Sequence, residues 1–140
     1  MEIAIRHECS ESDWEIVSNT LREVGMAHYE PAVHKKAFDN SYICVFAYRK
    51  DQLVGFGRAI SDGVYQAAIY DVAVTPDLQK KGIGSKIIKS IVSGLPNCNF
   101  ILYTIPGRED FYRKLGFRKM FTGMAKFIKA DDLKQRGFTE

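Results

Sequence analysis

With 140 residues, 46% of them hydrophobic and 26% charged, the chain has the composition of one globular domain over residues 1–140, and not that of a disordered protein. No apolar run reaches the roughly 20 residues of a membrane-spanning helix, and the first residues do not resemble a signal peptide, so we expect a cytoplasmic protein with no membrane partner. The net charge of +3 is too mild to indicate a nucleic-acid partner, which usually shows a broader basic stripe.

The cysteines and histidines indicate neither a disulfide framework nor a metal site. The three cysteines are odd in number and widely spaced, and no Cys-x-x-Cys pair occurs. His28 and His34 lie six residues apart, a spacing that does not place them on one face of a helix. We therefore expect no metal.

The first forty residues predict a short strand and two helices. Residues 2–7 alternate as in a strand, and Ser10-Glu-Ser-Asp13 resembles a capping box that begins a helix ending at Gly25. One face of that helix carries its apolar residues, Trp14, Val17, Leu21 and Val24.

Pro31 is placed to open a second helix that runs to Phe38. Around it lie Tyr29, Glu30 and His34, a mixture that suits contact with a substrate. A surface helix with incidental aromatic residues explains the same mixture equally well.

Three strands in series predict an antiparallel sheet. The apolar run 42–48 indicates a buried strand, and a polar turn leads into a second strand over 53–60. Within that strand, Gly55 and Gly57 indicate a bulge or a closely packed neighbour. A second hairpin turn leads to a long strand over 64–74.

The next elements predict a helical crossover. After Thr75-Pro76 stops the long strand, isoleucines and a valine recur at helical spacing, at positions 83, 87, 88, 91 and 92. The strand over 99–104 follows this crossover and is expected to lie parallel to the strand over 64–74.

The last forty residues predict a short helix over 108–115 ended by Gly116, a final strand over 119–128, and a polar tail of loose helical character.

The turn between the long strand and the crossover helix, Gln79-Lys-Lys-Gly-Ile-Gly-Ser85, has the composition of an anion site. The first N–H groups of a helix are unpaired and lie at the positive end of its dipole. Two glycines let a ligand approach the backbone, Ser85 adds a hydroxyl donor, and two lysines add positive charge. We call residues 79–85 the pyrophosphate cradle.

The glycine spacing excludes two common phosphate motifs. The Gly-Lys-Ser/Thr ending of a P-loop is absent, and Ile87 stands where the Rossmann fingerprint needs its third glycine. The string Val-x-Val-x-Pro followed by Gln-x-x-Gly-x-Gly instead resembles the coenzyme A-binding motif of the GNAT superfamily of N-acetyltransferases. A second stretch, Phe111-Tyr-Arg-Lys-Leu-Gly-Phe117, resembles that family's Phe-Tyr-x-Lys-x-Gly-Phe signature. The order of the predicted elements is similar over nearly the whole chain.

The resemblance implies an α/β (α+β) fold with a mixed, mostly antiparallel central sheet, a splayed parallel strand pair and about four flanking helices. It implies acetyl-CoA as the cosubstrate and an amine as the acceptor. Analogy with the family also suggests a homodimer. The backbone of the strand before the cradle would bind the pantetheine arm, with an N–H of Ala73 or Val74 as the oxyanion donor. The implied coenzyme contacts are Val72, Ala73, Val74, Gln79, Lys80, Lys81, Gly82, Ile83, Gly84, Ser85 and Tyr112.

Tyr112 is the candidate general acid, because a phenol is protonated at neutral pH and can donate to a leaving thiolate. The resemblance places a catalytic tyrosine at this point of the signature. The alternative is that Tyr112 only packs against the coenzyme.

A general base is harder to find. Related enzymes often carry Glu or His on the strand before the cradle, where this chain has Ala68 and Tyr70. By strand alternation Asp71 points away from the face of Tyr70, so it becomes a base only if a bulge intervenes, and it is otherwise a partner for a backbone or basic group. Ordered water held by Tyr70 or Tyr65 is the other alternative.

The acceptor is the least determined part. Tyr29, Tyr65, Tyr70 and Tyr103 could line an aromatic pocket, or could belong to a tyrosine-rich core. The Ile-Tyr-Asp-Val string also resembles small GNAT enzymes related to plant and cyanobacterial arylalkylamine acetyltransferases, which implies a small primary amine, aromatic or polyamine-like. A protein or aminoacyl-tRNA amine, and a coenzyme A-binding module without turnover, stay open as alternatives.

Overall fold

The computed structural model describes all 140 residues and divides them into two compact units, residues 1–102 and residues 103–140. Each unit is described on its own below. In neither unit is any helix both long enough and apolar enough to cross a membrane.

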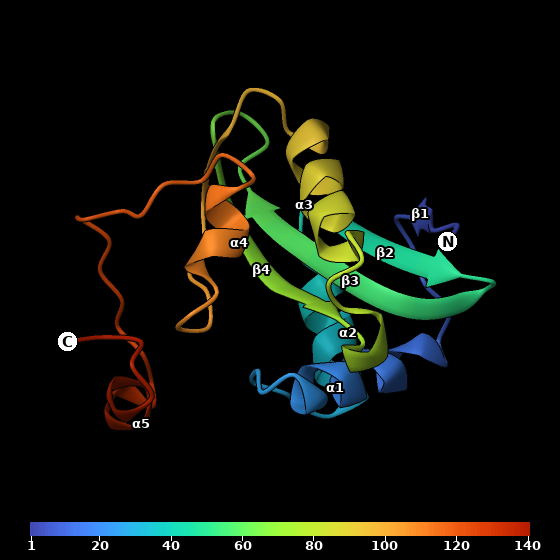
Figure 1. Cartoon of the computed structure of the whole chain (residues 1–140), viewed down its shortest axis with the longest axis horizontal. Helices are drawn as coiled ribbons and strands as arrows, with labels where there is room; N and C mark the ends of the chain where they lie inside the picture. Colours follow the sequence, from blue (N-terminus) through green and yellow to red (C-terminus); the bar gives the residue numbers. More distant parts are fainter. The chain divides into compact units, whose positions relative to one another are not determined.

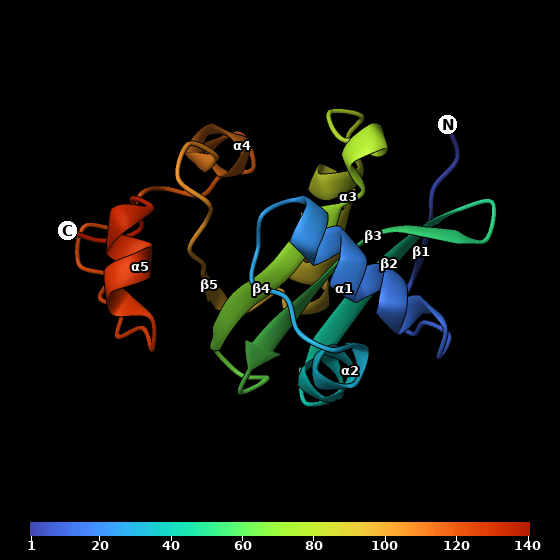
Figure 2. The same cartoon turned by 90° about the horizontal axis from the view of Figure 1, so that it is seen from below.

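The first unit is built on one mixed sheet with strand order β1-β2-β3-β4-β5 (Figures 1 and 2). All neighbours are antiparallel except β4 and β5, which run parallel as predicted. The strands are β1 (Ala4–Arg6), β2 (Ile43–Arg49), β3 (Gln52–Ser61), β4 (Gln66–Val74) and β5 (Asn99–Ile101).

The predicted helices form close to the predicted places. The first unit contains α1 (Asp13–Glu23), α2 (Pro31–Asp39), the 3-10 turn η1 (Pro76–Leu78) and α3 (Ile83–Gly94). The predicted capping box of α1 forms in part: the Asp13 carboxylate accepts the backbone N–H of Ser10 at 3.1 Å, but no side-chain hydroxyl caps the helix. Gly25 follows the helix at a φ of 81°, the left-handed geometry that ends helices.

The two faces of the sheet are covered by different helices, with α1 and α2 on one face and α3 on the other (Figures 1 and 2). The α1–α2 side holds an aromatic core in which Trp14 meets Phe38 and Phe46 edge-on. The α3 side is aliphatic and buries Ile83, Ile87, Ile88 and Ile91.

Gly55 and Gly57 on β3 allow α3 to approach the sheet closely, as the sequence predicted. A Cβ at Gly55 would lie 2.9 Å from the Ile87 side chain, and one at Gly57 would lie 3.0 Å from the Ile87 and Val72 side chains. The contact at Gly55 is shorter than real Cβ atoms make, and those at Gly57 would require the neighbouring side chains to shift, so both glycines permit the close approach of α3 to the sheet.

The second unit contains α4 (Glu109–Arg113) and α5 (Ala130–Gln135), which brings the α-helices to five where about four were expected. Gly116 ends the stretch after α4 at a φ of 92°. The predicted strand over 119–128 is wrong, and Phe121, Met124 and Ile128 are more than 90% exposed. No strand in this unit is available to pair with it, so the apolar pattern has no hydrogen-bonded ladder to join.

Candidate active site

A bulge in β4 lies next to the predicted coenzyme edge. Phe56 pairs with Ala73 and Arg58 pairs with Tyr70, so Gly57 alone faces the two β4 residues between them. The first of these two, Asp71, has a φ of 57°, which is unusual for any residue except glycine and tolerated best by Asn and Asp. The extra residue breaks the alternation of side chains along the strand.

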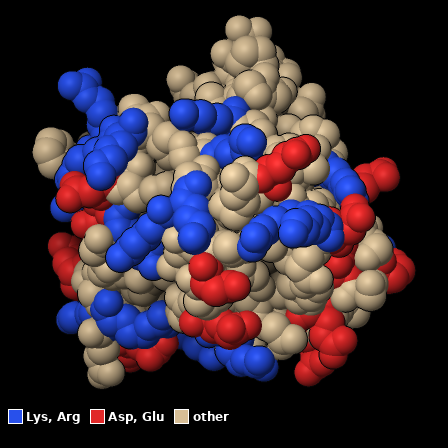
Figure 3. All heavy atoms as spheres, turned by 45° about the vertical axis from the view of Figure 1, so that its right-hand side comes forward, with Lys and Arg blue, Asp and Glu red and all other residues tan.

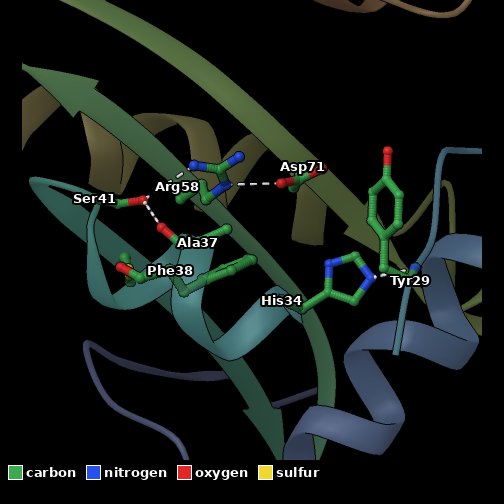
Figure 4. Close-up of polar contacts among 8 residues, drawn as sticks. Tyr29, His34, Ala37, Phe38, Ser41, Arg58 and Asp71 are labelled. Atoms are coloured by element: carbon green, nitrogen blue, oxygen red, sulfur yellow. Dashed lines mark hydrogen bonds and ion pairs between the residues drawn. The ribbon is translucent and has the colours of Figure 1, made fainter. Parts of the chain in front are cut away.

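The bulge corrects the expectation that Asp71 points away from Tyr70. Arg58 lies opposite Tyr70 in the sheet, and its Nε donates to the Asp71 Oδ2 at 2.7 Å (Figure 4). The same guanidinium lies 5.4 Å from the Tyr70 ring centroid and 5.6 Å from that of Phe38, and its terminal nitrogen contacts the Ser41 hydroxyl at 3.2 Å. Asp71, Tyr70 and Arg58 therefore form one cluster on the α1–α2 side.

This geometry favours the structural alternative for Asp71. The side chains of Arg58 and Asp71 are only 14% and 22% exposed, so little water reaches the pair. A proton taken by Asp71 would remove the charge that neutralises Arg58 in a partly buried place, which is costly. The arrangement therefore opposes Asp71 as the base, and Arg58 is a site residue that the sequence analysis did not single out.

Beyond the bulge, one edge of β4 has no strand partner. The pairing of β4 with β5 covers only Gln66, Ala67 and Ala68, and no strand of this unit pairs with β4 on that side from Ile69 onward. We call the stretch from Ile69 to Val74 the open edge. It has the form expected of a splayed parallel pair, with backbone groups available to an extended ligand.

Strand register separates the two candidate oxyanion donors. The N–H of Thr75 donates to the Val54 carbonyl of β3 at 2.9 Å. Because backbone N–H and C=O groups alternate in direction along a strand, those of Ala73 also face β3, and those of Val74 face the open edge. The Val74 carbonyl accepts a hydrogen bond from the Gln79 side chain at 3.1 Å, which is consistent with this direction. The available N–H is therefore that of Val74.

The pyrophosphate cradle has the predicted strand–turn–helix form. Gly82 caps α3 at a φ of 86°, a left-handed conformation that a residue with a Cβ rarely adopts, and Lys80 is also left-handed at 62°. The first hydrogen bond of the helix runs from the Lys86 N–H to the Gly82 carbonyl. The N–H groups of Ile83, Gly84 and Ser85 precede it and have no partner within the helix.

A groove continues from the cradle along the outer face of α3, lined by Gly82, Ser85, Lys86, Lys89, Ser90 and Ser93. Lys86 and Lys89 are residues that the sequence analysis did not single out. Their spacing of three residues, one turn beyond the cradle, was the available signal. The groove extends the cationic surface past the pyrophosphate position.

Tyr112 lies in α4 of the second unit. Its ring meets Phe111 and Phe117 edge-on at centroid distances of 4.9 and 5.8 Å. Burial raises the pKa of Tyr112 above its ordinary value of 10.0, although the positive charge of Arg108 acts in the other direction. The phenol is therefore protonated at neutral pH, as a general acid requires.

The four tyrosines of the predicted aromatic pocket are divided between the two units. Tyr65 precedes β4, about 16 Å along the strand from Tyr70 at roughly 3.3 Å per residue. Tyr103 belongs to the second unit, where its ring contacts Phe127 and Phe138. Tyr70 lies on Arg58, and Tyr29 lies beside His34 at a ring distance of 5.7 Å.

The surface of the chain carries mixed charge. On the face drawn in Figure 3, Lys and Arg side chains are interspersed with Asp and Glu and do not form one uninterrupted basic area. No group of three or more His, Cys, Asp or Glu residues is arranged to hold a metal ion.

Comparison with known proteins supplies the family. Residues 40–119, which contain β2 to β5, the open edge and the cradle, match the model of the acetyltransferase (GNAT) domain. The chain is 37% identical over 92 residues to the uncharacterized N-acetyltransferase ycf52 of Pyropia yezoensis, covering 61% of this chain and 53% of that protein. It is 28% identical over 121 residues to serotonin N-acetyltransferase 2, chloroplastic, of Oryza sativa, covering 81% and 60%. The chain thus spans about half the length of the curated relatives it matches.

Solved structures agree on the fold. A GNAT family acetyltransferase of Streptococcus pneumoniae superposes with a TM-score of 0.74 at 24% identity, covering 91% of this chain and 98% of that one. Glucosamine-6-phosphate N-acetyltransferase of Arabidopsis thaliana gives 0.72 at 15% identity, covering 92% and 100%. Together with the mixed sheet, the open edge of β4 and the glycine-capped helix that follows it, the match of residues 40–119 to the acetyltransferase (GNAT) domain establishes that the chain belongs to the GNAT acetyltransferase family.

Proposed function

We propose that the protein is an acetyl-CoA-dependent N-acetyltransferase that moves an acetyl group directly to a primary amine. The observation that carries this proposal is the open edge of β4, which leads within a few residues to the unpaired N–H groups at the start of α3. One extended ligand with an amide-bearing arm and a pyrophosphate would match both features. Pantetheine and the diphosphate of coenzyme A have that order.

The coenzyme is held mainly by backbone. The edge from Val72 to Val74 offers hydrogen bonds to the pantetheine arm, and the cradle receives the pyrophosphate. Gln79 braces the edge through the Val74 carbonyl, and Gly82 is needed for its left-handed turn. Lys86 and Lys89 line the groove beyond the cradle and are placed to contact the remaining phosphate of the nucleotide.

In the reaction, the neutral amine attacks the thioester carbonyl carbon, so that a C–N bond forms and the C–S bond breaks. The Val74 N–H donates to the developing oxyanion. The proton released by the amine goes to water, and the thiolate leaving group takes one from the Tyr112 hydroxyl. The proposal for Tyr112 rests on its place in the Phe-Tyr-x-Lys-x-Gly-Phe stretch and on its raised pKa.

The base in this proposal is ordered water and not Asp71, because the Asp71 carboxylate already neutralises Arg58. Tyr70, which lies on the same cluster, is placed to orient such a water molecule. Because Asp71 is engaged by Arg58, no side-chain base is assigned, and this favours one alternative that is not an enzyme: a coenzyme A-binding module without turnover. The retained tyrosine of α4 supports the enzyme.

We propose a small arylalkylamine or polyamine-like acceptor. The names of the relatives span several acceptors, from the serotonin N-acetyltransferase of Oryza sativa to histone acetyltransferase TAP1 of Glycine max, which is 36% identical over 69 residues. A protein or aminoacyl-tRNA amine is therefore the alternative within the enzyme class. The cytoplasmic location and a homodimer stay predictions.

The test is thiol release from acetyl-CoA, read with a thiol reagent against arylalkylamines, polyamines, aminosugars and peptides with free amino termini. We expect one class to give turnover, and Tyr112→Phe to lower kcat by about 100-fold or more while coenzyme binding is retained. Tight binding of acetyl-CoA with no turnover on any amine would favour the module without turnover.

A further inference from the structure

The loop between α1 and α2, residues 24–30, is fastened at Tyr29 by both of its backbone groups. The Tyr29 N–H donates to Nε2 of His34 at 2.9 Å (Figure 4). The Ser18 hydroxyl donates to the Tyr29 carbonyl at 2.5 Å. The Tyr29 side chain itself is 59% exposed. An exposed aromatic ring on a backbone held at both ends is preorganised for contact with a ligand.

His34 must be neutral to make this contact. Nε2 accepts the Tyr29 N–H, so the ring proton of the neutral imidazole lies on Nδ1. The ring is only 4% exposed, and burial lowers the pKa of His34 below its ordinary 6.5. Of the charged groups that act on it, Asp71 raises this pKa, while Arg58 and His28 lower it.

The same helix face connects His34 to the cluster at the bulge. Phe38 lies one turn after His34 on α2, and the Arg58 guanidinium lies over its ring. Arg58 in turn holds Asp71, at the start of the stretch of β4 where the acetyl group is proposed to bind. In Figure 4 the Tyr29 ring points up from the loop.

We propose that His34 is a positioning residue for the acceptor, whose neutral imidazole holds residues 24–30 so that the Tyr29 ring forms a platform for the aromatic part of an arylalkylamine. This inference rests on the proposed N-acetyltransferase function and gives it a substrate class and a pH dependence. Protonation turns Nε2 into a donor that faces the donating Tyr29 N–H, so the hydrogen bond is lost and the loop is released. Acceptor binding therefore weakens as the pH falls, while coenzyme binding does not.

Three variants separate these roles. His34→Gln keeps an acceptor near the position of Nε2 but does not titrate, His34→Leu removes the acceptor, and Tyr29→Ala removes the platform. Circular dichroism and coenzyme binding confirm that each variant is folded. Because His34→Leu alters a buried site, His34→Gln keeps the test decisive if the leucine variant does not fold.

The first measurement is hydrogen exchange of the Tyr29 amide, corrected for intrinsic rate, at about pH 7.5 and about pH 4, the lower value chosen because burial lowers the pKa of His34 below its ordinary value. In the unmodified protein we expect the Tyr29 amide to be protected at the higher pH and not at the lower pH. In His34→Gln we expect it to be protected at both pH values. Equal protection of the unmodified protein at both values would overturn the role of His34.

The second measurement is tryptamine binding to the coenzyme A-saturated protein by NMR titration. We expect Tyr29→Ala and His34→Leu to weaken it by about tenfold, the scale of one aromatic contact. His34→Gln should match the unmodified protein at the higher pH and lack its weakening in acid.

Two results of this titration would overturn the proposal: no tryptamine binding by the unmodified protein, or unchanged binding by Tyr29→Ala. If tryptamine binds as described but releases no thiol from acetyl-CoA, the proposed activity fails and the positioning role stands.

Discussion

Asp71 combines a partly buried ion pair with a left-handed backbone, and substitutions at this position separate the two contributions to stability. Asp71→Ala removes the partner of Arg58 and leaves a residue with a Cβ at a φ of 57°. Asp71→Gly removes the same charge but adopts the left-handed backbone without strain. Arg58→Met removes the cation, together with the guanidinium that lies over Phe38, and retains an unbranched apolar stem.

The magnitudes follow from burial and conformation. Breaking a fully buried pair costs about 3–5 kcal/mol and breaking an exposed one about 0–1 kcal/mol. Side-chain exposures of 14% and 22% place this pair between those limits, so its loss should cost about 2 kcal/mol. The left-handed conformation adds about 1 kcal/mol for alanine. Asp71→Ala should therefore lower the free energy of unfolding by about 3 kcal/mol. Asp71→Gly should lower it by about 2 kcal/mol, because glycine adopts the left-handed backbone without strain.

The assay is urea unfolding followed by the fluorescence of Trp14, the single tryptophan, which is buried in the core between α1 and the sheet. A cycle with Arg58→Met and the double variant Arg58→Met/Asp71→Ala should give a coupling energy of about 1–2 kcal/mol. Equal losses for Asp71→Ala and Asp71→Gly would refute the backbone argument. A coupling energy below about 0.5 kcal/mol would refute the ion-pair argument.

Three further predictions test other parts of the structure. Gly55→Ala should destabilise by about 1–3 kcal/mol, because its Cβ would lie 2.9 Å from Ile87 Cδ1 and 3.2 Å from the Ala73 carbonyl. A thermal melt against Gly123→Ala, whose Cβ would lie no closer than 3.7 Å to the Met120 side chain, checks this. Lys86→Ala and Lys89→Ala should each weaken coenzyme A binding by several-fold, and more strongly at low salt, whereas Lys134→Ala on α5 should leave binding unchanged. Calorimetry at two salt concentrations measures this, and a loss of affinity that does not depend on salt would indicate a cause other than charge. Since burial raises the pKa of Tyr112 above 10.0, turnover should stay level to about pH 9 and fall only as the phenol ionises. An alkaline decline that persists in Tyr112→Phe would count against the general acid.

Local patterns in the sequence were sufficient for most of the first unit. The helix that follows Pro31, the crossover helix and the hairpins formed where periodicity and turn residues placed them. Gly55 and Gly57 correctly indicated a close neighbour, because a glycine in a strand interior usually marks a place where something packs against the backbone. The cradle formed as predicted for the same local reason, a strand stopped by proline and a glycine-initiated helix.

Two features depended on contacts that no local pattern contains. The apolar pattern of residues 119–128 met the criteria for a strand, but a strand forms only where a neighbour completes its hydrogen-bond ladder, and its own unit offers none. The direction of Asp71 depended on an extra residue in β4 opposite Gly57, and strand alternation alone gave the wrong face.

The sequence by itself therefore determined the family, the order of the elements in the first unit and the strand–turn–helix form of the cradle, because each depends on residues that lie close together along the chain. Only the tertiary structure decided that Asp71 neutralises Arg58, that Val74 and not Ala73 presents its backbone to the open edge, and that His34 holds Tyr29. These outcomes depend on strand register and on side chains from separate elements meeting in space, and hydrophobic periodicity contains no information about either.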